Sequence, residues 1–360
     1  MAFALTPRVL RRGLELFAVI SVAGLAGLLA YYLIRFDDRL GTFVEPILTL
    51  RWGWMLAALV LASSDWVGGG LRLWVVTRHV HPGVRLRDMM LAAGMGAWAM
   101  YLTPFNAGSS PMTLWVMGRA GVRIPEALTS IFITFVATVA FLACAGPLAI
   151  VFGAGRQLAE HGIVLGITVY DLFLTSLTIF CALGALMVVT LFFPGVIRNA
   201  LVWLAAHLGR RSRRVAARME NLTAGLDRAR DCMVAFRGPR GLLRLLWAIL
   251  ISGPSHAHKL LAGYVAMRAL GIEANFVDIL MVQAFITFLL YFAPTPGASG
   301  LAEVISAAVM SAYLTRVDTP LYTLIWRFTI SYATVGVGSV IFWQWLRRGL
   351  IGREETVAAP

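Results

Sequence analysis

Two long apolar runs are broken at their centres, the first by YLTPFNAGSS at residues 101–110 and the second by YFAPTPGASG at residues 291–300. Proline lacks a backbone donor and glycine tolerates unusual dihedral angles, so such a break ends one helix and begins another. Each run therefore predicts two short helices joined by an irregular turn. The second helix of each pair is too short to cross a bilayer. We expect two re-entrant hairpins, which are tolerated where protein or a water-filled cavity surrounds the bare backbone.

The composition of the whole chain favours a membrane protein. Of its 360 residues, 59% are hydrophobic and 14% are charged, and the mean hydropathy is +0.78. A soluble domain typically carries about 45–50% apolar and about 25% charged residues. A soluble enzyme, a nucleic-acid-binding protein and a secreted disulfide scaffold are therefore excluded, and the three cysteines form no disulfide or metal pattern.

The remaining apolar segments predict an all-α polytopic membrane protein with about six transmembrane helices: 14–35, 52–76, 125–152, 163–193, 242–269 and 320–346. With two hairpins that return to their own side, both termini lie in the cytoplasm. Most of the 31 Lys and Arg residues then fall on the cytoplasmic side; six fall outside, and Lys259 and Arg327 fall within spans. This positive-inside bias predicts a multi-pass protein of the cell (inner, cytoplasmic) membrane.

The two broken runs align at a constant offset of 190, which matches Asp88 with Asp278, Tyr101 with Tyr291 and Pro104 with Pro294. Because three spans separate corresponding elements, the second half enters the membrane in the opposite sense, as in transporters built from inverted repeats. The predicted division is a tail with the first span and outer loop (1–51), repeat one (52–152), a linking span (153–193), an Arg-rich cytoplasmic segment (194–240), repeat two (241–347) and a cytoplasmic tail (348–360).

Ionisable side chains inside the predicted spans indicate a hydrated cavity near the midplane, because such groups are costly in hydrocarbon and usually face a cavity or a partner. The N-terminus of each short second helix also attracts anions, and Ser110 before Pro111 fits a helix N-cap. Together these features favour an anionic headgroup, such as a lipid phosphate, as the ligand. The predicted binding and translocation residues are Asp65, Ser110, Asp171, His256, Lys259, Glu303 and Arg327. The alternative is that pairs such as Glu303 and Arg327 only hold helices together.

The turns of the two hairpins are the predicted hinges, at Pro104, Gly108, Pro294, Pro296 and Gly297. No metal site is predicted, because the two histidines of His256-Ala257-His258 face opposite sides of a helix. No nucleotide motif or catalytic motif is recognisable, so we expect no cofactor and no enzymatic activity.

An amphipathic helix is predicted within residues 194–240, with apolar residues at spacings of three and four surrounded by arginines. Such a segment attracts anionic lipid of the inner leaflet, packs on the protein's own inner face, or simply sets the topology. Nucleic acid is not expected as a partner.

The sequence resembles the flippase-like integral membrane proteins of the lysylphosphatidylglycerol synthase transmembrane region. The resemblance is carried by PTPGASGLAE at 294–303, similar to the family's Pro-x-Pro-Gly-Gly-x-Gly-x-x-Glu run, and by Trp326-Arg327. It implies a protein thought to move lipids or lipid-linked molecules between leaflets, with roles for Glu303 and Arg327. The family's bifunctional members add a soluble aminoacyl-transferase domain, which we expect this chain to lack. Ala298 replaces the second glycine of the run.

The resulting hypothesis is a flippase-like transporter for a lipid or lipid-linked molecule, acting through a midplane cavity between inverted repeats. Its partners are membrane phospholipids, with anionic lipid at the inner leaflet, and the candidate protein partners are a second copy of the chain or a lipid-synthesis protein. Two alternatives stay open: a membrane-embedded enzyme acting on lipid-linked substrates, and a non-transporting partner or regulator of a lipid-synthesis complex.

Overall fold

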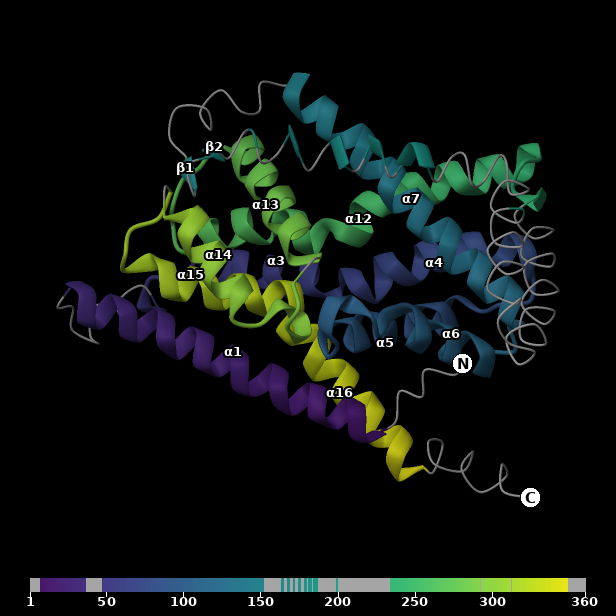
Figure 1. The fold of residues 1–360 in the computed structure, drawn as a ribbon, viewed down its shortest axis with the longest axis horizontal. Helices are drawn as coiled ribbons and strands as arrows, with labels where there is room; N and C mark the ends of the chain where they lie inside the picture. Colours follow the sequence, from purple (N-terminus) through teal and green to yellow (C-terminus); the bar gives the residue numbers. More distant parts are fainter. Residues whose placement is uncertain are drawn as a thin grey trace, which may run out of the picture.

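The computed structural model describes residues 7–36, 47–151, 234–291, 293–311 and 313–348, with isolated positions between 163 and 199 (Figure 1). These residues are almost entirely helical. Most of the predicted 194–240 segment and most of the predicted 163–193 span lie outside the described residues, which resume at residue 234. At the start of that span, β1 (Ile163–Val164) and β2 (Ile167–Thr168) pair as antiparallel strands, so the helix predicted to begin there does not do so.

The helices of the described residues are numbered in sequence order. Their bounds are α1 (Pro7–Phe36), α3 (Trp52–Ala62), η1 (Ser63–Asp65), α4 (Val67–Val80), α5 (Leu86–Tyr101), η2 (Pro104–Asn106), α6 (Ser109–Arg119), α7 (Ile124–Val151), α12 (Pro239–Ala269), α13 (Phe276–Tyr291), η3 (Pro296–Ala298), α14 (Leu301–Met310), α15 (Asp318–Arg327), η4 (Phe328–Tyr332) and α16 (Ala333–Arg347). The η4 segment is one π-helical turn that joins α15 to α16 without a break.

Four helical stretches in the described part of the chain are long and apolar enough to cross a membrane: Val9–Ile34, Trp52–Val80, Ile124–Ala145 and Asp318–Arg347. They coincide with four of the six predicted spans. At the predicted 242–269 span the structure has α12, which is 31 residues long but more polar. The chain is therefore a multi-pass membrane protein.

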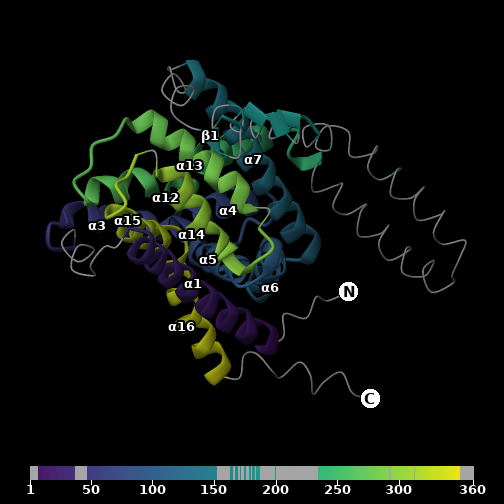
Figure 2. The same ribbon diagram turned by 60° about the vertical axis from the view of Figure 1, so that its left-hand side comes forward.

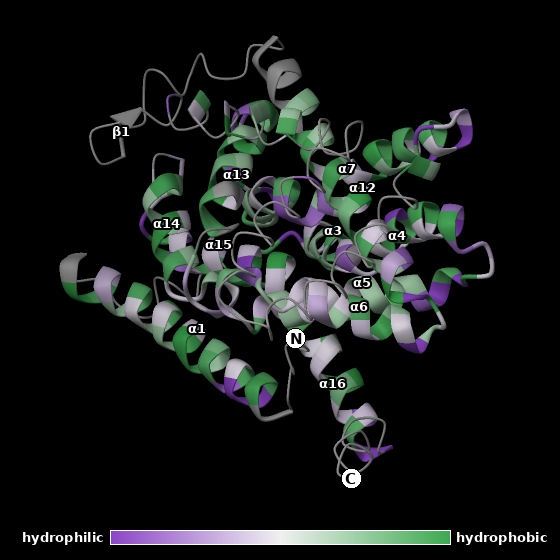
Figure 3. Cartoon of the chain, turned by 45° about the vertical axis from the view of Figure 1, so that its right-hand side comes forward, coloured by the Kyte–Doolittle hydropathy of each residue, from purple (hydrophilic) through white to green (hydrophobic). Residues whose placement is uncertain are grey.

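Exposed apolar residues occur along these helices, and Figure 3 colours much of α1 as hydrophobic. On α1, Val19, Val22 and Ile34 are exposed by 66%, 67% and 83%. Soluble monomers rarely expose large apolar patches. These surfaces are suited to contact lipid tails.

Both broken runs form two helices around a turn, as the prolines and glycines predicted. The first helices, α5 and α13, have 16 residues each, and the second helices, α6 and α14, have 11 and 10. At 1.5 Å per residue they are about 24 Å and about 15–17 Å long, whereas the hydrocarbon core is about 30 Å thick.

The two turns share an unusual backbone. Phe105 and Asn106 in η2 have φ of 52° and 58°, and Gly297 and Ala298 in η3 have φ of 56° and 55°. Two consecutive left-handed residues thus follow a proline in each turn, so Pro104 is equivalent to Pro296. The predicted match of Pro104 with Pro294 was wrong: the helices α5 and α13 keep the offset of 190, but the second turn is two residues longer.

The two turns also meet each other in space, because the Phe105 N–H donates to the Ala293 carbonyl at 3.2 Å. Among the described residues the core has three apolar clusters. One joins α12, α13, α14 and α15, a second joins α1, α5, α6 and α16, and a smaller third joins α4, α7 and α12. Figures 1 and 2 both place α1 beside α14 and α15, which it contacts along one edge.

Helix α4 packs tightly between α5 and α12, and its glycines allow this. A Cβ at Gly68 would lie 2.7 Å from the Cα of Ser255, a backbone atom that cannot move aside. A Gly68→Ala variant is therefore expected to lose about 1–3 kcal/mol of stability through overpacking, measured by thermal unfolding in detergent. Gly118, in α6, has open space around its Cβ position. Gly118→Ala is the matched control, and an equal loss in both variants would contradict the close approach.

Candidate functional site

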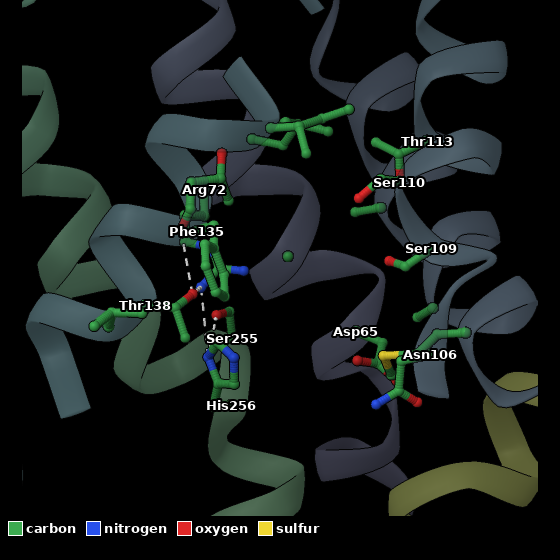
Figure 4. A pocket seen from close by; sticks show the side chains of 18 of the residues that line it. Asp65, Arg72, Asn106, Ser109, Ser110, Thr113, Phe135, Thr138, Ser255 and His256 are labelled. Atoms are coloured by element: carbon green, nitrogen blue, oxygen red, sulfur yellow. Dashed lines mark hydrogen bonds between the residues drawn. The ribbon is translucent and has the colours of Figure 1, made fainter. Parts of the chain in front are cut away.

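A cavity of about 520 Å³ lies between α4, α5, α6, α7 and α12. Figure 4 shows that its polar residues form two facing walls. One wall presents Arg72, Thr138, Ser255 and His256, and the other presents Asp65, Asn106, Ser109, Ser110 and Thr113. Apolar residues such as Phe135 and Leu142 also line the cavity. The cavity thus combines cations and hydroxyl groups with an apolar lining.

Arg72 is the cation at the centre of the first wall. Its Nη1 donates to Thr138 Oγ1 at 2.6 Å and to Ser252 Oγ at 3.2 Å, and it lies 3.5 Å from His256 Nδ1. Arg72 was not among the predicted site residues, because it was counted with the cytoplasmic cations. A signal was present, because Arg72 lies inside the predicted 52–76 span.

Asp65 sits in η1, where the helix that began at Trp52 is interrupted before α4. Its Oδ1 lies 3.1 Å from His258 Nε2, and its Oδ2 accepts hydrogen bonds from Tyr101 at 3.2 Å and Thr334 at 3.1 Å. The carboxylate therefore connects α5, α12 and α16. As predicted, His256 and His258 face different sides: His256 lines the cavity, and His258 pairs with Asp65.

Lys259 lines the large cavity and also a second, smaller cavity of about 40 Å³. Its Nζ lies 6.0 Å from the centre of the Tyr101 ring, and its charge acts on Asp65. Met100 and Asn106 likewise border both cavities. These residues form the partition between the two spaces, close to the junction of the turns.

Arg327 and Glu303 form a buried ion pair, with 2.9 Å between Nε and Oε1 and with 1% and 0% of their side chains exposed. Arg327 also donates to the Gly297 carbonyl at 3.1 Å and to Ser299 Oγ at 3.3 Å. Glu303 accepts from the Gly300 N–H at 2.8 Å and from the Tyr332 hydroxyl at 3.2 Å. The pair ties the second turn to α15, the helix-holding arrangement weighed above.

The predicted site residues thus fall into different places. Asp65, Ser110, His256 and Lys259 line the large cavity; Arg327 borders only the small one, and Glu303 borders neither of the two. Asp171 is exposed and lies in neither lining.

The predicted N-cap at Ser110 was wrong. Helix α6 begins one residue earlier, and Gly108 occupies the N-cap position without a side-chain bond. The Gly108 N–H instead donates to Thr103 Oγ1 at 2.7 Å, so a threonine of the turn provides the hydrogen bond. Ser110 is left free to face the cavity.

Of the predicted hinge residues, Gly108 and Gly297 sit where space or backbone requires glycine. A Cβ at Gly108 would lie 2.6 Å from the Ala99 carbonyl oxygen, and Gly297 has positive φ. Pro296 is buried in η3, whereas Pro104 is exposed in η2. Among the residues that the structure describes, no group of His, Cys, Asp and Glu is placed to hold a metal ion.

Comparison with known proteins adds one finding. The model of a family described as the lysylphosphatidylglycerol synthase TM region matches residues 16–338. The match spans most of the chain and includes both turns and both cavities. No curated protein matches the chain.

Proposed function

The chain belongs to the lysylphosphatidylglycerol synthase TM-region family, and from this premise we propose that it moves a lipid with an anionic headgroup between the two leaflets of its membrane. The family relates the chain to lipid metabolism or translocation. The observation that carries the finer proposal is the large cavity, in which Arg72 and Lys259 face hydroxyl groups from α6 across a volume of about 520 Å³. Sites for small molecules commonly enclose about 300–1,000 Å³, which is enough for a phospholipid headgroup.

The proposed architecture has six spans, two re-entrant hairpins, inverted repeats and cytoplasmic termini. Its support is the shortness of both hairpin arms, the shared left-handed backbone of the turns and their meeting at Phe105 and Ala293. Broken helices that meet at the middle of a bundle are typical of transporter binding sites.

The chemistry of the cavity fits a phosphodiester. Arg72 presents guanidinium donors, which bind phosphate in a fixed fork, while Lys259 adds a point charge. Ser109, Ser110 and Thr113 supply hydroxyl groups on the opposite wall, suited to the polar remainder of a headgroup. Apolar residues such as Phe135 also line the cavity and are suited to contact the first methylenes of the acyl chains.

Replacing Arg72 by glutamine tests this proposal. The glutamine keeps a donor for Thr138 but removes the charge, and hydrogen bonds to charged groups contribute about 1.5–3 kcal/mol. We expect lipid movement in proteoliposomes, followed with a fluorescent anionic phospholipid, to fall about tenfold or more. Arg85, an exposed arginine paired with Asp88, provides the control variant Arg85→Gln.

Unchanged lipid movement in a folded Arg72→Gln protein would overturn the assignment of this cavity. Turnover of a lipid-linked substrate by the purified protein would favour the alternative of a membrane-embedded enzyme. Co-purification with a fixed partner while lipid movement is absent would favour a regulator.

A further inference from the structure

The two cavities are lined at equivalent positions of the two halves. Three pairs of lining residues are related by the offset of 190 that relates α5 to α13, and a fourth pair by the offset of 192 that relates the turns. These pairs are Gly69 and Lys259, Ala97 and Thr287, Met100 and Leu290, and Asn106 and Ala298. Lys259, Met100 and Asn106 border both cavities, and Ala97 and Thr287 are the pair in which each member borders one cavity alone. The small cavity is the counterpart of the large one.

Equivalent positions nevertheless enclose very different volumes, about 520 Å³ in the first half and about 40 Å³ in the second. The ion pair accounts for the difference. Arg327 borders the small cavity, pairs with Glu303 and donates to Gly297 and Ser299, and so holds the η3 turn against α15. In the first half the position equivalent to Glu303 is Pro111, so the η2 turn has no such carboxylate.

We infer that the small cavity is a second site for the same anionic headgroup, equivalent to the large one and closed in this conformation by Arg327. This inference rests on the proposed function for the identity of the ligand. When the ion pair separates, Arg327 exchanges the Glu303 carboxylate for the phosphate of the lipid. Lys259 borders both cavities and remains beside the headgroup on either side of the partition.

The contact between the turns couples the two sites. Phe105 and Ala293 join η2 to η3 through a backbone hydrogen bond, so a movement of η3 away from α15 pushes on η2. Opening of the second cavity then narrows the first. Helix α1 packs beside the Glu303–Arg327 ion pair. Ser21 Oγ lies 2.9 Å from Ser299 Oγ, and the Phe17 ring lies beside the Arg327 guanidinium.

Single cysteines at Ala97 and Thr287, one in each cavity at equivalent positions, test whether opening of the small cavity narrows the large one. The native cysteines, Cys144, Cys181 and Cys232, are first replaced by serine. In nanodiscs, a small water-soluble methanethiosulfonate is expected to modify Ala97→Cys faster than Thr287→Cys. Adding Glu303→Gln is expected to raise the rate at Thr287→Cys about tenfold or more and to lower the rate at Ala97→Cys, because loss of a buried ion pair shifts the conformational equilibrium strongly.

Opposite changes at the two thiols support the inference. Faster modification at both positions would indicate local unfolding and overturn it, as would no change at either. Tyr332→Phe, which removes one hydrogen bond to Glu303 while keeping both charges, is a milder variant and is expected to shift both rates in the same directions. The reagent reports only on the accessibility of the two thiols. Opposite rate changes without lipid movement would therefore contradict the proposed function, and lipid movement without opposite rate changes would contradict the second site.

The ligand is tested in the Glu303→Gln, Thr287→Cys protein. Phosphatidylglycerol in a phosphatidylcholine nanodisc is expected to slow modification about threefold or more, relative to phosphatidylcholine alone, because a bound headgroup blocks the thiol. Protection by inorganic phosphate without protection by phosphatidylglycerol would overturn the assignment to a lipid.

Discussion

Among single substitutions in the membrane core, Arg327→Ala is expected to destabilise the protein most. The free energy of unfolding falls by about 3–5 kcal/mol, because Glu303 is left buried with its charge uncompensated. The carboxylate would keep only its neutral donors, the Gly300 N–H and the Tyr332 hydroxyl. Thermal unfolding in detergent is the measurement, with a midpoint lower by about 4–7 °C for a chain of this length.

The double variant Arg327→Met, Glu303→Gln separates the charge from the shape. Replacing both members of a buried ion pair by uncharged residues of similar volume is often neutral, so the double variant is expected to regain most of the lost stability. Lipid movement is nevertheless expected to stay low in it, because the proposed second site has lost its cation. A double variant as unstable as Arg327→Ala would show that the guanidinium acts through its contacts with Gly297 and Ser299 and not through its charge.

The outline of the fold could be predicted from local sequence. Pro104, Gly108 and Gly297 interrupt apolar runs. Proline lacks a backbone N–H donor and glycine tolerates unusual dihedral angles, so the chain turns at these points whatever the rest of the fold. The lengths of α5 and α13 follow from the distance between such breaks. The two extra residues of the second turn could not be placed, because in apolar sequence of low identity Pro294 and Pro296 match Pro104 equally well.

The sequence identified most residues of the candidate site but not which of them contact one another. The cost of a charge in hydrocarbon singled out Asp65, Lys259, Glu303 and Arg327 as residues that need a polar surrounding. Their partners come from distant segments: Asp65 meets Thr334 across 269 positions. Periodicity along a single helix contains no information about such pairs. Arg72 was assigned to the cytoplasm because charge counting alone cannot distinguish an arginine at the membrane surface from one that faces an internal cavity.

Asp65→Asn is expected to increase the amount of anionic lipid that the purified protein retains and to slow its movement between leaflets. Asp65 shares the large cavity with Lys259, whose charge it partly neutralises. An incoming phosphate therefore competes with this carboxylate for the same ammonium group. Removal of the competitor leaves Lys259 and Arg72 to the ligand, and a gain of about 1.4 kcal/mol gives about tenfold tighter retention. Tighter binding of the ground state also slows release, since it stabilises one position of the lipid more than the path between positions.

The substitution is also chosen to keep the structure. The asparagine carbonyl oxygen can accept the hydrogen bonds from Tyr101 and Thr334 that Asp65 Oδ2 accepts. Asp88→Asn, at an exposed pair with Arg85, is the matched control for loss of one acid. Mass spectrometry of the retained lipids, beside the rate of lipid movement, gives both quantities from one preparation. If Asp65 only holds α5, α12 and α16 together, Asp65→Asn changes stability without raising retention; a lipid content equal to that of the control therefore contradicts competition for Lys259 and places the headgroup elsewhere in the cavity.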